Sequence, residues 1–205
     1  MTSIHILREF QGYLAVEKPS GLLCQPGRGE ALRDSVLQRI RSLHPGAELV
    51  HRLDRDTSGL LLVALEAQAH RALSGLFQHR MIRKTYESLC HGILEGQSGF
   101  IASPLAKYQD RPPLYRSHPE GRMALTAWTC LDRRQDYSRV ALFPLTGRSH
   151  QLRVHLSELG HPIMGDPLYN PEWHLSDRLL LHATRLSFDC PISGCQVDLR
   201  SPTPF

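Results

Sequence analysis

The chain has 205 residues, enough for one large domain or two closely joined halves, and its composition is that of an ordinary globular protein. Its 24 lysines and arginines against 20 acidic residues give a formal net charge of +4, which is compatible with a nucleic-acid partner but does not require one. The five cysteines are scattered without a CxxC pair, which argues against a disulfide framework or a zinc site and indicates reduced thiols. No segment has the length of a membrane span and the N-terminus lacks a signal peptide, so we expect a cytoplasmic protein without a membrane partner.

Short apolar segments alternate with turn residues in the N-terminal part. A strand is expected at residues 13–16, where an apolar run ends at a Lys-Pro-Ser-Gly turn. Residues 31–44 carry apolar side chains at helical spacing, which predicts a helix that Pro45 and Gly46 end. Residues 60–65 form an apolar run whose length suits a strand covered on both faces.

Asp54 occupies the connection in front of that strand. Arg52 and Arg55 flank it, and two nearby guanidinium groups favour the ionised form of a carboxylate. An ionised aspartate on a rigidly anchored connection can act as a nucleophile, a base or a metal ligand. The plainer interpretation is a structural ion pair at a strand end, with residues 56–58 capping the turn, and local chemistry alone leaves both open.

The remaining elements follow from spacing and turn residues. Residues 107–122 (KYQDRPPLYRSHPEGR) are Pro-rich, polar and basic, which predicts a long functional or mobile loop. A largely antiparallel arrangement of strand pairs with a few helices predicts an α+β fold with a mixed sheet. The expected helices lie at residues 67–79 and 149–159, and the expected strands at residues 49–50, 85–90, 100–102, 123–131, 137–143, 179–188 and 196–200.

Residues 51–60 (HRLDRDTSGL) resemble the signature of the RluA-type pseudouridine synthases, and further segments of that family follow the same order. Residues 17–22 (EKPSGL) resemble its early K-P-x-G motif, and residues 146–155 (TGRSHQLRVH) resemble its G-R-x-H-Q-[IL]-R-x-H motif. Residues 178–183 (RLLLHA) resemble its late L-H-A motif. Together the motifs cover nearly the whole chain. The resemblance implies a largely antiparallel sheet in two halves with a central catalytic cleft. Many relatives carry an S4-type RNA-binding domain before this part; because only 17 residues precede Lys18, we expect a single catalytic domain without it.

The resemblance also implies roles for individual residues. Asp54 is the expected catalytic residue, through attack at C1′ of the ribose, attack at C6 of the uracil, or a glycal route. Tyr86 would pack against the target uracil, although a lone strand tyrosine is more often a core residue. Arg153 would pair with Asp54, although the plain alternative is an exposed helix arginine. Arg52 would insert where the nucleotide leaves the RNA, and Leu181 would lie against the extruded base, although each also suits a structural role.

RNA is the expected partner, and its phosphates would be bound by basic side chains. The expected phosphate ligands are Lys18, Arg28, Arg83, Lys84 and Arg148, with further contacts from residues 107–122.

No cofactor is expected, because nucleotide-binding glycine motifs are missing from the sequence. We also expect no metal, because His150 and His155 are five residues apart and helical ligand pairs need three or four. A monomer is expected.

The expected activity is isomerisation of uridine to pseudouridine in structured RNA, in a 23S ribosomal RNA stem-loop, the transfer RNA anticodon loop, or both. Three alternatives stay open. One is the same chemistry at another uridine, and a second is a non-catalytic RNA-binding protein. The third is a nucleoside or glycoside hydrolase, which needs a second carboxylate, with Asp56 and Asp166 as weak candidates.

Overall fold

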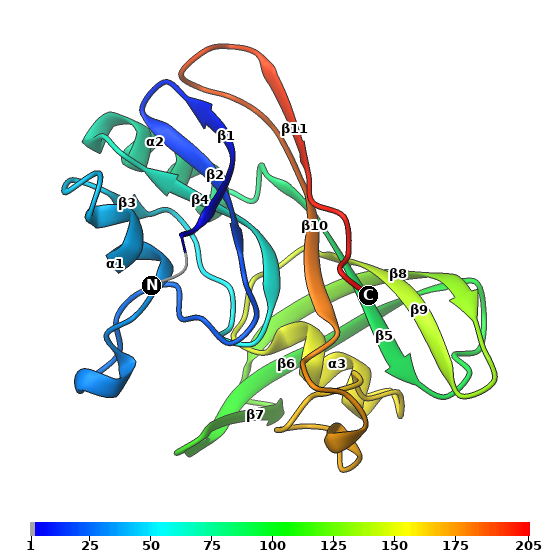
Figure 1. Ribbon diagram of the computed structural model, residues 1–205. Coiled ribbons are helices and arrows are strands. Elements are labelled where there is room, and N and C mark those ends of the chain that lie inside the picture. The colour runs from blue at the N-terminus through cyan, green and yellow to red at the C-terminus, as the bar shows by residue number, and fades with distance from the viewer. Residues whose placement is uncertain (1–2) are drawn as a thin grey trace. The chain divides into compact units, whose positions relative to one another are not determined.

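A computed structural model describes residues 3–205, and the chain forms two compact units (Figure 1). Unit 1 comprises the chain up to Lys84 together with Ala183–Pro204. Unit 2 comprises Thr85–His182 and the last residue, Phe205. The chain therefore passes from one unit to the other within a strand on both occasions, first in β5 (Arg83–His91) and then in β10 (Leu181–Asp189).

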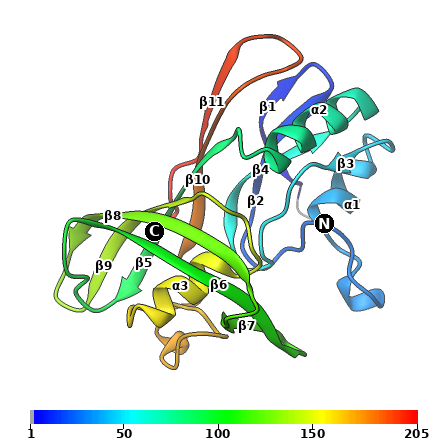
Figure 2. The same ribbon diagram turned by 180° about the vertical axis from the view of Figure 1, so that it is seen from behind.

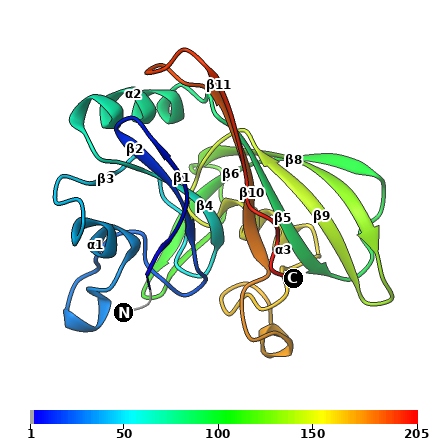
Figure 3. The ribbon, with the colours of Figure 1, turned by 45° about the horizontal axis from the view of Figure 1, so that its top comes forward.

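Unit 1 is built on a sheet in which β1, β2, β4 and β10 are neighbours in that order, with β11 added to β10 and β3 added to β4. The pairings of β1 with β2, of β2 with β4 and of β10 with β11 are antiparallel. The β10–β11 hairpin is open to view in Figure 1 and is seen nearly edge-on in Figure 3. The bounds are β1 (His5–Phe10), β2 (Tyr13–Lys18), the 3-10 helix η1 (Glu30–Leu32), α1 (Val36–Arg41), β3 (Glu48–Leu49), β4 (Ser58–Ala64), α2 (Ala67–Gln78) and β11 (Gln196–Arg200).

Strand β4 is the centre of unit 1, and every one of its residues is buried. Alternate residues of β4 and β2, among them Leu62 and Ala15, pack in one core cluster with Leu73 and Leu76 of α2. Residues three or four apart lie on one face of a helix, so the apolar spacing of α2 fixes which side meets the sheet. The result is a rigid strand directly after the residues that carry Asp54.

Gly59 in β4 is required by close packing as well as by backbone conformation. Its φ is +112°, and an added Cβ would lie 2.4 Å from the carbonyl oxygen of Ala183 in β10. A side chain at this position would therefore force β4 and β10 apart.

The helix expected over residues 31–44 is wrong in length, because a 3-10 turn and the shorter α1 replace it. Ser35 interrupts the pattern: its backbone is extended, and its Oγ accepts a hydrogen bond from the amide of Gln38 (3.1 Å). Serine at this position is a favourable helix N-cap, and this local preference overrides the longer apolar spacing. Strand β1 was not expected from the sequence, because its exposure shows no period-two alternation.

Unit 2 contains a meandering antiparallel sheet in the order β5–β9–β8–β6–β7. Helix α3 lies against this sheet (Figure 2), and its Leu152 and Leu156 share a core cluster with Trp128 of β8 and Leu142 of β9. Leu159, expected in the same apolar stripe, is exposed at the end of the helix. The bounds are β6 (Ser98–Asp110), β7 (Pro113–Ser117), β8 (Arg122–Arg133), β9 (Tyr137–Pro144), α3 (Gln151–Glu158) and the 3-10 helix η2 (Trp173–Leu175).

The long loop expected at residues 107–122 is wrong. Most of this segment forms the β6–β7 hairpin and the start of β8, with a tight turn at Arg111-Pro112. The prolines were taken to exclude strands, but Pro112 lies in the turn and Pro113 is the first residue of β7. At the first position of a strand the missing amide hydrogen removes little stabilisation. The basic side chains thus stand on a defined hairpin.

The strand expected at residues 100–102 is much longer in the structure, where β6 runs from Ser98 to Asp110. The other expected elements agree with the structure to within a few residues, and the α+β class is confirmed. Within residues 3–205, no helix is both long enough and apolar enough to cross a membrane.

Candidate functional site

Asp54 lies in the connection between β3 and β4 of unit 1, where it is partly buried. Leu53, on one side, is buried, while Arg52 and Arg55 are exposed. Arg55 forms an ion pair with Asp56, with its Nε 3.2 Å from Oδ1. The connection thus holds the Asp54 carboxylate next to the buried Leu53, with the exposed Arg52 before this pair and the exposed Arg55 after it.

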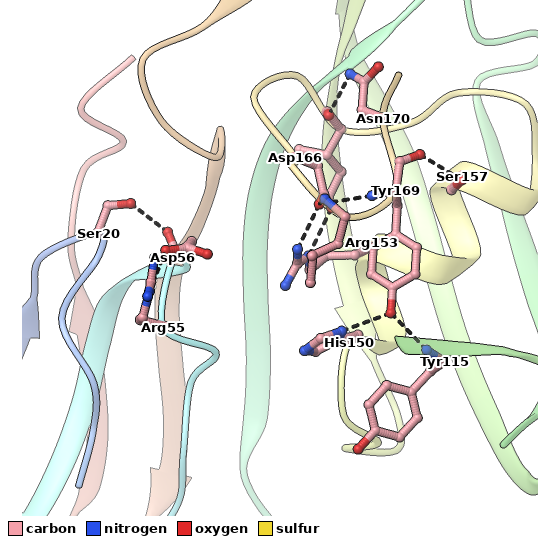
Figure 4. Close-up of polar contacts among 12 residues, drawn as sticks. Ser20, Arg55, Asp56, Tyr115, His150, Arg153, Ser157, Asp166, Tyr169 and Asn170 are labelled. Atoms are coloured by element: carbon pink, nitrogen blue, oxygen red, sulfur yellow. Dashed lines mark hydrogen bonds and ion pairs between the residues drawn. The ribbon is translucent and has the colours of Figure 1, made fainter. Parts of the chain in front are cut away.

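The last residue of β2, Lys18, and the residues that follow it hold this connection in place. The Nζ of Lys18 donates to the carbonyl of Arg55 (2.6 Å) and also to those of Pro19 and Leu22 (2.9 and 2.7 Å). The hydroxyl of Ser20 donates to the carbonyl of Asp56 (2.6 Å; Figure 4). An ammonium group that donates to three carbonyls ties the residues after β2 to the connection at Arg55.

Cys24 and His51 hold the start of the connection. The Sγ of Cys24 lies 3.2 Å from both the amide nitrogen and the carbonyl oxygen of Leu53, accepting from one and donating to the other. The Nε2 of His51 accepts from the amide of Leu62 in β4 (3.0 Å), and its ring stacks on Phe77 of α2. Burial and the charge of Lys84 lower the pKa of His51 to about 3, so the ring stays neutral and keeps its acceptor.

Lys18 was expected to bind RNA phosphates, and that prediction is wrong. The side chain is fully buried and its ammonium is committed to three carbonyls. Arg28 and Arg83 are exposed, so both are accessible to RNA phosphates. Lys84 is partly buried, and desolvation together with the charge of Arg80 lowers its pKa to about 8.

In unit 2, Arg153 is one of the largest fully buried side chains, so the plain alternative of an exposed helix arginine is wrong. Its Nε and Nη2 donate to the two carboxylate oxygens of Asp166 at 2.8 and 2.6 Å (Figure 4). Planar two-point pairing of this kind holds a guanidinium group in one orientation. The expected pairing of Arg153 with Asp54 stays a prediction.

Asp166 is itself held by its own loop. Its Oδ1 accepts from the amides of Leu168 and Tyr169 at 2.9 and 3.2 Å. The preceding Gly165 has a φ of +70°, and an added Cβ would lie 1.8 Å from the carbonyl oxygen of Arg178, so only glycine fits. A fully buried carboxylate bound in this way is unsuited to the general acid or base role that the hydrolase alternative required.

Tyr169 connects this ion pair to the β6–β7 hairpin. Its hydroxyl accepts from the amide of Tyr115 in β7 (3.0 Å) and lies 2.8 Å from Nδ1 of His150 (Figure 4). The guanidinium carbon of Arg153 lies 5.2 Å from the centre of its ring. His150, which has a left-handed φ of 55°, is the residue just before α3.

The other expected site residues of unit 2 occupy the sheet and its edge. Tyr86, in β5, is partly buried against the core cluster of this unit. Leu181 is buried in the same cluster at the start of β10, which agrees with its structural interpretation. Arg148 is partly buried, and its Nε donates to the carbonyl of Met123 (3.1 Å). The structure therefore places Asp54 and Arg52 in unit 1, and Tyr86, Arg153 and Leu181 in unit 2.

Sequence reasoning missed the residues that hold the site residues in place. Ser20, Cys24 and Tyr169 attracted no prediction, and Asp166 was considered only as a weak catalytic candidate. One signal was available for Asp166: it directly follows a glycine, about ten residues after the matched segment 146–155. No histidine, cysteine or carboxylate group within residues 3–205 is clustered in a way that would hold a metal ion.

Comparison with known proteins gives consistent matches. The model of the RNA pseudouridylate synthase family matches residues 12–158. A dual-specificity RNA pseudouridine synthase RluA of Vibrio cholerae is 42% identical, over 98% of this chain and 84% of that protein. The RluA of Escherichia coli K12 is 41% identical over 98% of this chain and 93% of its own length. The solved structure of human RNA pseudouridylate synthase domain containing 1 has a TM-score of 0.84 at 28% identity and covers 99% of this chain and 84% of its own.

Proposed function

Because the chain belongs to the RNA pseudouridylate synthase family, and so is an isomerase that converts uridine to pseudouridine in RNA, we propose that it modifies both ribosomal and transfer RNA. The similarity to RluA proteins named as dual-specificity enzymes, along nearly the whole chain, supports two classes of target. The 23S ribosomal RNA stem-loop and the transfer RNA anticodon loop are the proposed sites. A cytoplasmic location, as a monomer, belongs to the same proposal.

Asp54 is the proposed catalytic residue. The observation that carries this assignment is the fastening of its connection by Lys18, Ser20, Cys24 and His51, since a reacting carboxylate has to be held within a fraction of an ångström of its target. In the reaction, the N1–C1′ bond breaks, the uracil turns, and C5 bonds to C1′. C5 loses its proton to solvent and N1 gains one, so no outside atom is incorporated and no cofactor is required.

Arg153, Tyr86, Arg52 and Leu181 are the proposed supporting residues of the site. Arg153 would compensate the Asp54 carboxylate, and its rigid attachment to Asp166 suits that task. Tyr86 and Leu181 would contact the extruded base, and Arg52 would fill the space it leaves. Extrusion of a base costs a few kcal/mol, and less in a loop whose bases are already poorly stacked.

Exposed cations on both units are the proposed phosphate ligands. They include Arg28 and Arg83, with Arg148 and Lys84 as partly buried members. The β6–β7 hairpin adds Arg116, whose guanidinium carbon lies 5.0 Å from the ring centre of the exposed Tyr108. An arginine stacked on a tyrosine presents both a charge and an aromatic surface, which suits an unpaired stretch of RNA.

Tritium release tests the proposal. RNA labelled with tritium at uracil C5, prepared from a strain that lacks the gene, should release tritium with wild-type protein and none with Asp54→Asn. The asparagine keeps the size of the side chain, and the Asp198→Asn variant, at an exposed ion pair of β11, is the matched control. A wild-type protein that binds this RNA without releasing tritium would establish the non-catalytic alternative.

Sequencing of pseudouridine positions in the deletion strain identifies the targets. Loss of modification in both RNA classes is expected. Loss at one RNA only, or at another uridine, would contradict dual specificity while leaving the chemistry intact.

A further inference from the structure

The structure assigns Tyr169 as a positioning residue that couples the β6–β7 hairpin to Arg153. This inference rests on the proposed function, in which the hairpin binds RNA and Arg153 supports Asp54. Tyr169 itself contacts neither the substrate nor the reacting atoms in this assignment. It acts through two other groups, one at each end of its side chain.

The hydroxyl end is attached to the hairpin. Tyr169 Oη accepts a hydrogen bond from the amide of Tyr115 in the middle of β7, and the ring of His150 packs against both tyrosines. A second attachment lies at the end of β7, where the amide of Ser117 donates to Oε1 of Glu158 in α3 (2.7 Å). Strand β7 is therefore tied to the region of α3 at two points, and only the first passes through Tyr169.

The ring and backbone of the same residue are attached to the ion pair. The ring lies beside the guanidinium group of Arg153 (5.2 Å to its centre), and the amide of Tyr169 donates to the carboxylate of Asp166. The carbonyl of Tyr169 accepts from the hydroxyl of Ser157 in α3 (3.1 Å; Figure 4). With both its backbone polar groups bonded, the backbone of Tyr169 cannot shift without disturbing Asp166.

The two ends carry separable tasks. The hydroxyl sets the position of β7, and with it the exposed cations of the hairpin, so its loss affects RNA binding. The ring packs beside the guanidinium group of Arg153 and restrains it, so its loss affects the chemical step. A residue needed only for folding would not divide its effects in this way.

Steady-state tritium release with Tyr169→Phe and Tyr169→Leu tests the assignment. The phenylalanine keeps the ring and should raise KM roughly five- to tenfold, a factor typical of one lost hydrogen bond, with kcat within about twofold of wild type. The leucine removes ring and hydroxyl and should also lower kcat, by roughly tenfold. Tyr137→Phe, in β9 and outside this network, is the control and should behave as wild type.

The outcomes separate the inference from the proposed function. Unchanged KM and kcat in Tyr169→Phe, alongside active wild type, overturn the coupling, as does a kcat in Tyr169→Phe that falls as far as in Tyr169→Leu. No release by wild type overturns the proposed function instead. If Tyr169→Leu fails to fold, the KM of Tyr169→Phe alone decides, because a value within twofold of wild type refutes the hydroxyl's role.

Discussion

Replacing Asp166 by asparagine should destabilise unit 2 severely. The carboxylate is fully buried, binds Arg153 through two charge-assisted hydrogen bonds and accepts two backbone amides. The asparagine can accept the amides but lacks the charge that compensates a buried guanidinium group. Removing one member of a buried ion pair costs about 3–5 kcal/mol. For a chain of this size each kcal/mol lowers Tm by about 2–4 °C, so Tm should fall by roughly 6–20 °C.

Differential scanning fluorimetry and urea denaturation measure the effect. Asp198→Asn, which loses exposed pairs with Arg185 and Arg200, is the control and should lower Tm far less than Asp166→Asn. The double variant Asp166→Asn with Arg153→Met removes both charges and should recover part of the loss, since the methionine needs no counter-charge. A Tm within about 2 °C of wild type for Asp166→Asn would refute the claim that the pair is an essential part of the buried structure.

Three further predictions concern other parts of the structure. Gly59→Ala should lower Tm far more than Gly21→Ala: both glycines have positive φ, but only Gly59 meets a neighbouring backbone, and equal losses in thermal denaturation would contradict this. Burial lowers the pKa of His155 to about 4, so between pH 6.5 and 4 the unfolded chain binds a proton that the folded chain does not. The free energy of unfolding should therefore fall by about 2 kcal/mol from pH 7 to 5. Urea titrations of His155→Gln should show a shallower fall over the same pH range. Arg28→Gln should reduce the slope of log RNA affinity against log salt concentration by about 0.7–0.9. Lys18→Met should instead lower the stability of the protein. A reduced slope at unchanged stability for Lys18→Met would show that Lys18 contacts a phosphate.

The fold could be predicted where the periodicity was long and undisturbed. Helix α2 was found to within one residue and the buried strand β4 to within two, because the apolar spacing is undisturbed in both. Ser58 and Gly59 open β4 instead of forming a turn in front of it. The predictions for residues 31–44 and 107–122 were wrong for the same reason. In each segment the conformational preference of one residue, serine or proline, was judged incorrectly against the pattern of its neighbours. Ser35 begins a helix in the middle of the expected one, and Pro113 begins a strand where a loop was expected.

The site could be predicted only in part. The family resemblance singled out Asp54 and Arg153; the structure shows the first partly buried on its connection and the second buried in an ion pair, and their catalytic roles stay predictions. The groups that hold them were out of reach, since Lys18 contacts Arg55 across 37 positions of sequence and Arg153 contacts Asp166 across 13. From the sequence, a lysine before a proline, such as Lys18, can be exposed to solvent or buried against backbone carbonyls, and the pattern does not distinguish the two. The contacts of Lys18 and Arg153 depend on which distant segments the fold brings together, and the periodicity of a single sequence does not show this.

The two contacts of Cys24 with Leu53 make this thiol a built-in reporter. Its Sγ is buried and engaged with the backbone next to Asp54, and burial raises its pKa, which keeps it in the unreactive thiol form. A thiol reagent should therefore modify the exposed Cys195 at once and Cys24 only when the connection opens. The labelling rate of Cys24 would thus measure, under native conditions, how often the connection that carries Asp54 opens.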